Sequence, residues 1–166
     1  MKASLTAIAT AVVLTIAVAP AAMAKALPAD PALFCMINVA ADAEPVCASS
    51  ADGLAQLQAR LGPAPAASVR IARLYDNRDY NTAAGFMDVY APADCTSTVG
   101  DIDYQIADLG VWKDRVSSFQ SVGNCATKLY SGMNYGGTSY PASGYLVAST
   151  YVGDAFNDRA RSARFS

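Results

Sequence analysis

The chain of 166 residues contains no histidine, so acid–base or nucleophilic chemistry would have to come from carboxylates, lysine, tyrosine or cysteine. Asp101, Asp103 and Asp108 lie close enough in sequence to suggest the carboxylate pair of a glycosidase. Such a pair needs one carboxyl group with a raised pKa and a separation of about 5–9 Å across a sugar cleft. The stretch also contains Gly100 and Tyr104, which favours an acidic loop in solvent.

Lys113 and Ser117 have the residue types of a serine–lysine dyad. A lysine acts as a base at neutral pH only where burial lowers its pKa, and Lys113 is followed directly by the charged residues Asp114 and Arg115. The absence of histidine excludes serine–histidine–aspartate and cysteine–histidine catalysis, as well as a zinc site of the HExxH type. We therefore predict no catalytic residue and expect that the protein is not an enzyme.

The four cysteines are an even number, which favours two disulfides in an oxidising compartment. Four cysteines allow three pairings, and we favour the two that each close a loop within one region. A closed loop of about 30 residues would contribute about 3–4 kcal/mol to stability. None of the four belongs to a C-x-x-C pair, so a zinc site is not favoured. The favoured disulfides are Cys35–Cys47 and Cys95–Cys125.

Residues 1–24 have the features of a cleaved secretory signal. A short positive start is followed by an uncharged apolar run from Ala3 to Val18, and Ala22-Met23-Ala24 matches the small-x-small cleavage pattern. The apolar run is shorter than the roughly 20 residues that a spanning helix requires. We expect a secreted, extracellular protein without a membrane span.

The charge of the chain argues against a nucleic-acid partner. The formal net charge is −2, and phosphate binding needs a clustered basic face. One short basic cluster, Arg159, Arg161 and Arg164, is interrupted by small residues, and we interpret it as a solvated surface. We expect a monomer.

The remaining chain divides into an Ala/Pro-rich extension, residues 25–68, and a strand-rich domain, residues 69–166. In the extension an N-cap sequence precedes leucines at helical spacing, which predicts one short helix from Ser49-Ser50-Ala51-Asp52, Leu54, Leu57 and Leu61. From Val69 onward apolar and polar residues alternate, and Gly, Asn, Asp and Pro recur at short intervals. This pattern predicts an all-β sandwich.

The domain contains an internal repeat. Leu74–Tyr80 aligns with Leu129–Tyr135 at an offset of 55 residues, and Trp112–Ser118 aligns with Phe156–Ser162 at an offset of 44. We expect Trp112 and Phe156, the first residues of the second pair of segments, to occupy equivalent positions in the core. The repeat predicts two Greek-key motifs with facing inner surfaces, at about 69–122 and 123–166.

The segment Tyr130–Gly137, with four residues between its two tyrosines, resembles the corner that opens a βγ-crystallin Greek key. Lys113–Ser118 and Asn157–Ser162 resemble the calcium-binding pattern of that superfamily: two Asn or Asp, two free positions, Ser or Thr, then Ser. The closest resemblance is to secreted peptidase inhibitors of family I36, the group of the Streptomyces metalloproteinase inhibitor, over residues 69–166. It implies a disulfide-stapled βγ-crystallin-like sandwich. Tyr80 is followed by Asn81 where the pattern has glycine, which predicts a distorted first hairpin.

The resemblance implies calcium sites that each draw ligands from both copies. Lys113 stands where Asn or Asp is expected, and Arg161 stands where a hydroxyl is expected, so both sites are degenerate. No cofactor is required, and weak calcium binding would use Asp114, Ser117, Asn157 and Asp158. In the competing interpretation the aspartates bond loop amides while Arg115 and Arg159 form local pairs.

The resemblance implies a non-enzymatic inhibitor whose partner is an extracellular metalloproteinase. The insertion from Cys95 to Tyr104 is a candidate contact loop because it is long, polar and tethered, although no reactive residue carries over from the family. Two other functions stay open, a calcium-responsive structural protein and a small secreted antimicrobial or killer-toxin-like protein.

Overall fold

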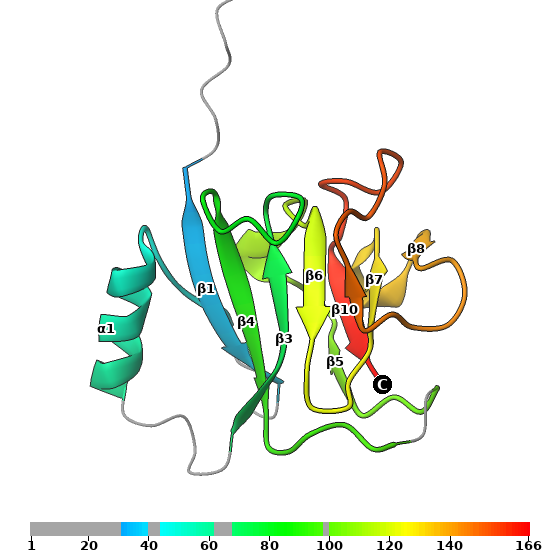
Figure 1. Cartoon of the computed structure of the whole chain (residues 1–166), viewed down its shortest axis with the longest axis horizontal. Coiled ribbons are helices and arrows are strands. Elements are labelled where there is room, and N and C mark those ends of the chain that lie inside the picture. Colours follow the sequence, from blue (N-terminus) through cyan, green and yellow to red (C-terminus); the bar gives the residue numbers. More distant parts are fainter. Residues whose placement is uncertain (1–30, 40–43, 62–67, 98–99) are drawn as a thin grey trace, which may run out of the picture.

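A computed structural model describes residues 31–39, 44–61, 68–97 and 100–166, which form two β-sheets with one helix on the N-terminal side (Figure 1). The expected signal at residues 1–24 lies outside the described residues. The elements are β1 (Leu33–Asn38), β2 (Val46–Ala48), α1 (Ala51–Leu61), β3 (Val69–Tyr75), β4 (Gly85–Ala91), β5 (Tyr104–Ile106), β6 (Ser118–Ser121), β7 (Thr127–Tyr130), β8 (Ser139–Tyr140), β9 (Ala148–Ser149) and β10 (Ser162–Phe165).

The two repeats exchange a strand. The first sheet has the order β2-β1-β4-β3-β6-β9, and the second has the order β5-β10-β7-β8. Strand β9 comes from the second repeat but pairs with β6 of the first, while β5 comes from the first repeat and pairs with β10 of the second. Each repeat therefore gives its third strand to the sheet of the other. This is a βγ-crystallin-like sandwich of two Greek keys, and the predicted fold class is confirmed.

The main hydrophobic core lies between the two sheets and draws on both repeats. Trp112 is fully buried and Phe156 is 6% exposed, and both belong to one apolar cluster with Phe119 and Phe165. The repeat alignment thus correctly places Trp112 and Phe156 in the core.

Both hairpins that open a repeat have the same backbone conformation. Asp79 and Tyr80 have φ values of 56° and 60°, and Asn134 and Tyr135 have 51° and 63°. Left-handed torsions are costly for residues other than glycine, so surrounding contacts must hold both pairs in place. The distortion expected from the missing glycine after Tyr80 is not found at these residues.

A buried serine holds each of these hairpins. Ser118 Oγ donates to the carbonyl of Asn77 at 2.6 Å and accepts from the N–H of Tyr80 at 3.2 Å. Ser162 Oγ makes the equivalent bonds, 2.7 Å to the carbonyl of Gly132 and 3.0 Å from the N–H of the second repeat's tyrosine. The same donor and acceptor positions recur at the offsets of 55 and 44, and together with the reciprocal strand exchange they relate the halves by a pseudo-twofold axis.

The N-terminal extension contains two strands that were not predicted from the sequence. Strand β1 pairs in parallel with β4 and antiparallel with β2. Gly85 permits this pairing, because a Cβ there would lie 2.0 Å from the carbonyl oxygen of Leu33. The predicted helix is α1, which begins after Ser50, whose Oγ accepts from the N–H of Gly53 at 3.0 Å.

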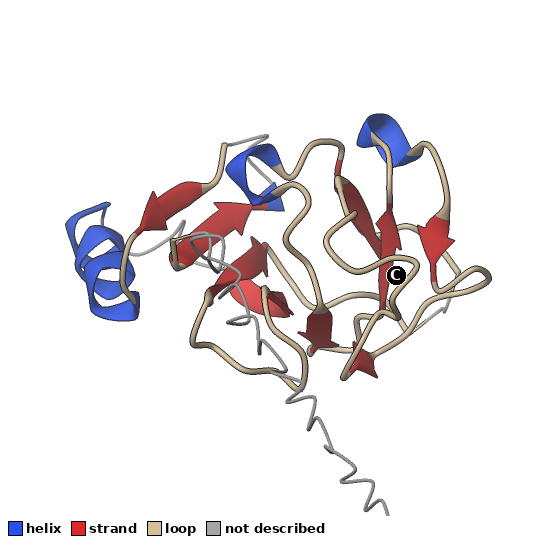
Figure 2. Cartoon of the chain, turned by 90° about the horizontal axis from the view of Figure 1, so that it is seen from above, coloured by secondary structure: helices blue, strands red, loops and turns tan. Residues whose placement is uncertain are grey.

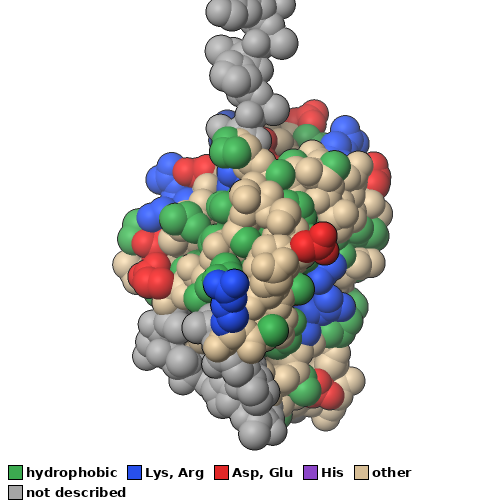
Figure 3. Space-filling view, turned by 90° about the vertical axis from the view of Figure 1, so that its left-hand side faces the viewer, with side chains coloured by type: hydrophobic (Ala, Val, Ile, Leu, Met, Phe, Trp, Pro, Cys, Tyr) green, Lys and Arg blue, Asp and Glu red, His purple; other side chains and the backbone are tan. Residues whose placement is uncertain are grey.

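Helix α1 lies outside the sheets at one end of the molecule (Figure 2). It buries Leu54 in a small cluster with Phe34 of β1 and Phe86 of β4. On the face over α1 and β1, charged side chains of both signs are dispersed among polar and apolar ones (Figure 3). The helix is therefore a packed part of the domain.

Two disulfides tie these parts together. Cys35 of β1 is bonded to Cys47 of β2, and Cys95 is bonded to Cys125, the two pairings favoured above. No helix in the described part of the chain has the length and apolar character needed to cross a bilayer.

Replacing either hairpin serine should destabilise the fold. We expect Ser118→Ala and Ser162→Ala each to lower the free energy of unfolding by about 1–3 kcal/mol, because each change leaves a tyrosine N–H and a carbonyl without their partner. Urea unfolding measures the loss. The exposed Ser143 supplies the control, whose alanine variant should stay within about 0.5 kcal/mol of the parent. Equal, negligible losses at both hairpins would contradict the anchoring role.

Candidate functional site

The residues expected to bind calcium lie on two loops, one ahead of β6 and one ahead of β10, that meet at the pseudo-twofold axis. The N–H of Asp114 donates to the carbonyl of Ala160 at 2.9 Å, and the N–H of Asp158 donates to the carbonyl of Val116 at 3.3 Å. These two bonds are equivalent under the repeat. Both aspartates have positive φ, 61° and 54°, so the two loops have equivalent backbones.

On one side of the axis is the Ser117 cluster, defined as Ser117, Asn157 and Asp158. Asp158 accepts from Ser117 Oγ at 3.4 Å and from Asn157 Nδ2 at 2.6 Å. Asn157 Oδ1 is buried and has no hydrogen-bond partner among the described residues. Burial and the negative charge of Asp76 raise the pKa of Asp158 above its usual value. This cluster therefore holds one carboxylate whose ionised form is disfavoured and one amide oxygen without a partner among the described residues.

On the other side of the axis, an arginine occupies the place of the serine. Arg161 is equivalent to Ser117, and its guanidinium binds Asp114 through both carboxylate oxygens, with Nε to Oδ1 at 2.9 Å and Nη2 to Oδ2 at 3.0 Å. The two side chains are 49% and 41% exposed, so solvent weakens the pair. The guanidinium neutralises the carboxylate from within the chain.

The four predicted ligands fall into two hydrogen-bonded groups. The structure brings Ser117, Asn157 and Asp158 together, while Asp114 is bound to Arg161. In the described ranges, no group of three or more His, Cys, Asp or Glu side chains is placed to hold a metal ion. The interpretation of the basic cluster as purely solvated also needs correction for Arg161, which is paired.

Arg164 corrects the same interpretation in another way. Its guanidinium lies 4.0 Å from the ring centroid of Tyr135 and 5.5 Å from that of Tyr130. A cation over an aromatic face is attracted by the ring quadrupole. Arg164 therefore packs against the aromatic corner of the second repeat.

Lys113 and Ser117 do not form a dyad. Lys113 Nζ donates to Asp108 at 3.1 Å, whereas Ser117 faces Asp158. Burial acts to raise the pKa of Asp108, but the N–H of Gly110 and the ammonium of Lys113 hold it below its usual value. An ionised carboxylate bound to an ammonium is unsuited to act as the acid of a glycosidase.

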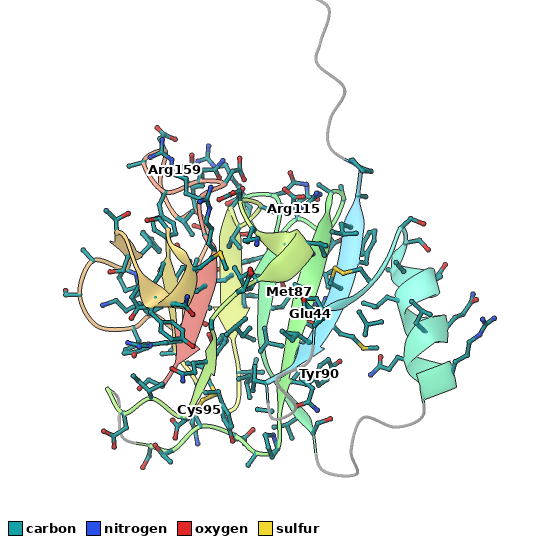
Figure 4. The ribbon with its side chains drawn as sticks, turned by 180° about the vertical axis from the view of Figure 1, so that it is seen from behind. Glu44, Met87, Tyr90, Cys95, Arg115 and Arg159 are labelled. Atoms are coloured by element: carbon teal, nitrogen blue, oxygen red, sulfur yellow. A yellow bond between two sulfur atoms is a disulfide. The ribbon has the colours of Figure 1, made fainter. Side chains whose placement is uncertain are left out.

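The repeat has a second pair of equivalent arginines, one of which is partnered. Arg115 donates to the carboxylate of Asp76 through Nε at 2.8 Å and also through Nη2. Its equivalent, Arg159, has no carboxylate partner among the described residues, because Ser131 stands where the first repeat has Asp76. Both arginines lie at the same end of the molecule, opposite Cys95 (Figure 4). Sequence reasoning missed Asp76, although the repeat alignment already pairs it with Ser131.

The opposite end of the molecule carries the contact loop, the predicted insertion from Cys95 to Tyr104, of which the structure describes all residues except 98–99. It is fixed by the disulfide at Cys95, whose N–H also donates to the carbonyl of Gly123 at 2.9 Å. Asp103 accepts from the N–H and the hydroxyl of Thr96, at 3.2 and 3.3 Å. The N–H of Gly100 donates to Ser166 Oγ at 2.6 Å. Asp103 thus braces the loop. Asp108 is instead bound to Lys113, so these two aspartates do not form the carboxylate pair of a glycosidase.

Comparisons with known proteins give likenesses of fold. No protein-family model matches the chain, and no curated protein matches it. The chain is similar to a βγ-crystallin domain from Clostridium beijerinckii, at 16% identity, 58% coverage of this chain, 97% of that chain and a TM-score of 0.40. A βγ-crystallin domain from Flavobacterium johnsoniae has 20% identity, with 58% of this chain and 93% of that chain covered and a TM-score of 0.38. The N-terminal domain of protein S has 14% identity, with 58% of this chain and 94% of that chain covered and a TM-score of 0.41. The fold assignment rests on the strand order described above.

Removing the charge of Asp158 should stabilise the fold in a pH-dependent way. Since its pKa is higher in the folded than in the unfolded chain, its ionisation opposes folding, and this cost grows as pH rises from the unfolded pKa through the folded one. We expect the stability of Asp158→Asn relative to the parent to be about 0.5 kcal/mol greater at pH 7 than at acid pH. Both proteins are measured in the presence of a metal chelator. A difference from the parent that is the same at pH 3 and pH 7 would contradict the assignment.

Proposed function

We propose that the protein is a secreted, non-enzymatic binding protein that inhibits an extracellular metallopeptidase through the contact loop. The observation that carries the proposal is that described residues of this loop, such as Thr96 and Ile102, are exposed while hydrogen bonds and a disulfide brace the described part of the loop. Its braces are the Cys95–Cys125 disulfide, the Thr96–Asp103 bonds and the Gly100–Ser166 bond. A loop ordered before binding loses less conformational entropy when it enters a cleft than a flexible peptide does.

The loop also presents an apolar side chain. Ile102 is 47% exposed, next to Asp103, whose N–H is bonded to the carbonyl of Phe165 at 3.0 Å. A large apolar residue held on a fixed backbone is suited to enter the apolar pocket of a peptidase cleft. Thermolysin-like enzymes are the appropriate targets, because the I36 resemblance points to metalloproteinases.

Secretion is part of the proposal. It is supported by the signal-like composition of residues 1–24 and by the two disulfides, which form and persist in oxidising compartments. A secreted chain would meet extracellular peptidases in the compartment where its disulfides are stable.

Inhibition assays against thermolysin-like metallopeptidases at equimolar ratio test the proposal. We expect inhibition by the parent and a loss of at least about tenfold in affinity for Ile102→Glu, because a charge replaces the apolar anchor. Val111→Glu is the matched control, since Val111 is 64% exposed and lies outside the contact loop; it should inhibit like the parent. Absence of inhibition across a panel of such enzymes would overturn the proposal.

A calcium-responsive structural role is the second candidate, and the Ser117 cluster favours it. The unpartnered amide oxygen of Asn157, the carboxylate of Asp158 and the hydroxyl of Ser117 are the kinds of oxygen that Ca²⁺ binds. The Arg161–Asp114 pair would leave the protein with one such site instead of two.

Calorimetry and thermal unfolding at millimolar CaCl₂ test this second role. At ten times the dissociation constant, one bound ion would add about 1.4 kcal/mol to the stability of the fold. We expect Asp158→Ala to remove the calcium response and Asp114→Ala, on the side filled by Arg161, to keep it. No binding heat together with an unchanged melting temperature would exclude the role.

A further inference from the structure

An apolar cavity of about 560 Å³ lies between β8 and the loop ahead of β10. Its walls include Tyr140, Pro141, Val152 and Phe156, and the charged side chain among its lining residues is Arg159. The cavity thus combines an apolar body with one cation. Ligand sites commonly have this composition, in which a few polar groups orient a mainly apolar molecule.

The first repeat shows what an arginine at this position binds. Arg115, the equivalent of Arg159, donates to the carboxylate of Asp76 and, at 2.9 Å, to the carbonyl of Pro31. The second repeat has Ser131 in place of that aspartate, and Ser131 Oγ instead accepts from the N–H of Thr138, a residue that lines the cavity. The cavity therefore borders Thr138, which is hydrogen-bonded to the position that corresponds to Asp76 in the first repeat.

The two repeats also differ in what covers the edge of their second strand. In the first repeat, β1 lies alongside β4, and its residues Cys35 and Ile37 join the core. In the second repeat β8 is the last strand of its sheet within the described residues, and the cavity opens along it. In the first repeat, apolar side chains of β1 thus cover the edge of β4. In the second repeat, the corresponding edge, along β8, is left open at the cavity.

We propose that this cavity binds a carboxylate joined to an apolar group, with the carboxylate on Arg159 and the apolar group against Tyr140 and Phe156. The ligand would supply both parts that the second repeat lacks, the charge of Asp76 and the apolar cover of β1. One guanidinium matches one carboxylate in charge and in its two-pronged geometry. The proposal does not depend on peptidase inhibition.

Two-dimensional NMR of the isotope-labelled full chain tests the proposal with phenylbutyrate as the probe and neutral phenylbutyramide as its control. We expect saturable shifts of amide signals within residues 138–159, with the acid binding at least about tenfold more tightly than the amide, since the charged hydrogen bonds are absent in the amide. Equal affinities for acid and amide, or shifts located elsewhere, would overturn the proposal.

Three variants identify the residue responsible. Arg159→Gln should weaken binding of the acid at least about tenfold and leave binding of the amide unchanged. Arg60→Gln, which removes an exposed arginine of α1, should bind both like the parent. Ser131→Asp should also weaken binding of the acid, because it places a carboxylate of the protein at the position equivalent to Asp76. Unchanged binding of the acid by Arg159→Gln would refute the role of this guanidinium.

Two sources could provide such a ligand, a free acid or the C-terminus of a peptide. A dipeptide, N-acetyl-Leu-Phe with a free carboxylate, distinguishes them when compared with phenylbutyrate. Tighter binding of the dipeptide identifies a peptide C-terminus as the source, and tighter binding of phenylbutyrate identifies a free acid. Failure of both to bind would refute the site.

Discussion

The structure depends on one constraint, that neither repeat can complete a sheet with its own strands. Strand β5 hydrogen-bonds to β10, and β9 hydrogen-bonds to β6, so the backbone groups of each exchanged strand are satisfied by the other repeat. Buried backbone groups without partners are costly, which ties the stability of each half to the presence of the other. The exchange also brings the loops ahead of β6 and β10 together at the axis. There the backbone N–H groups of Asp114 and Asp158 each donate to a carbonyl of the opposite loop.

Within this shared framework, the two halves keep the same backbone bonds but have different charged side chains. Ser118 and Ser162 fix hairpins of the same torsions, whereas the position of Ser117 is taken by Arg161 in the second half. On one side of the axis, Arg161 therefore neutralises the carboxylate of Asp114. On the other side, the side-chain oxygen of Asn157 has no partner among the described residues. Backbone geometry is limited by sterics and hydrogen bonding, so the two halves share it, while side chains at equivalent positions differ in charge.

The sequence was sufficient to predict the elements that depend on local pattern. The helix at Ala51–Leu61, the strand-rich domain and the twofold repeat follow from spacing, capping and alignment. The parallel pairing of β1 with β4 was not predictable, because it joins segments separated by α1 and depends on the close approach at Gly85. The partners of Arg161 and Arg115 were missed for a related reason: they lie 47 and 39 residues away in sequence, and only the fold brings them together.

The most direct test of the strand exchange is a measurement of cross-strand contacts by nuclear Overhauser effects in the full chain. The strand exchange predicts contacts between Phe119 and Ser149 and between Gln105 and Arg164, which are register partners across the two repeats. Contacts of β5 with the sheet of its own repeat, in place of β10, would contradict it.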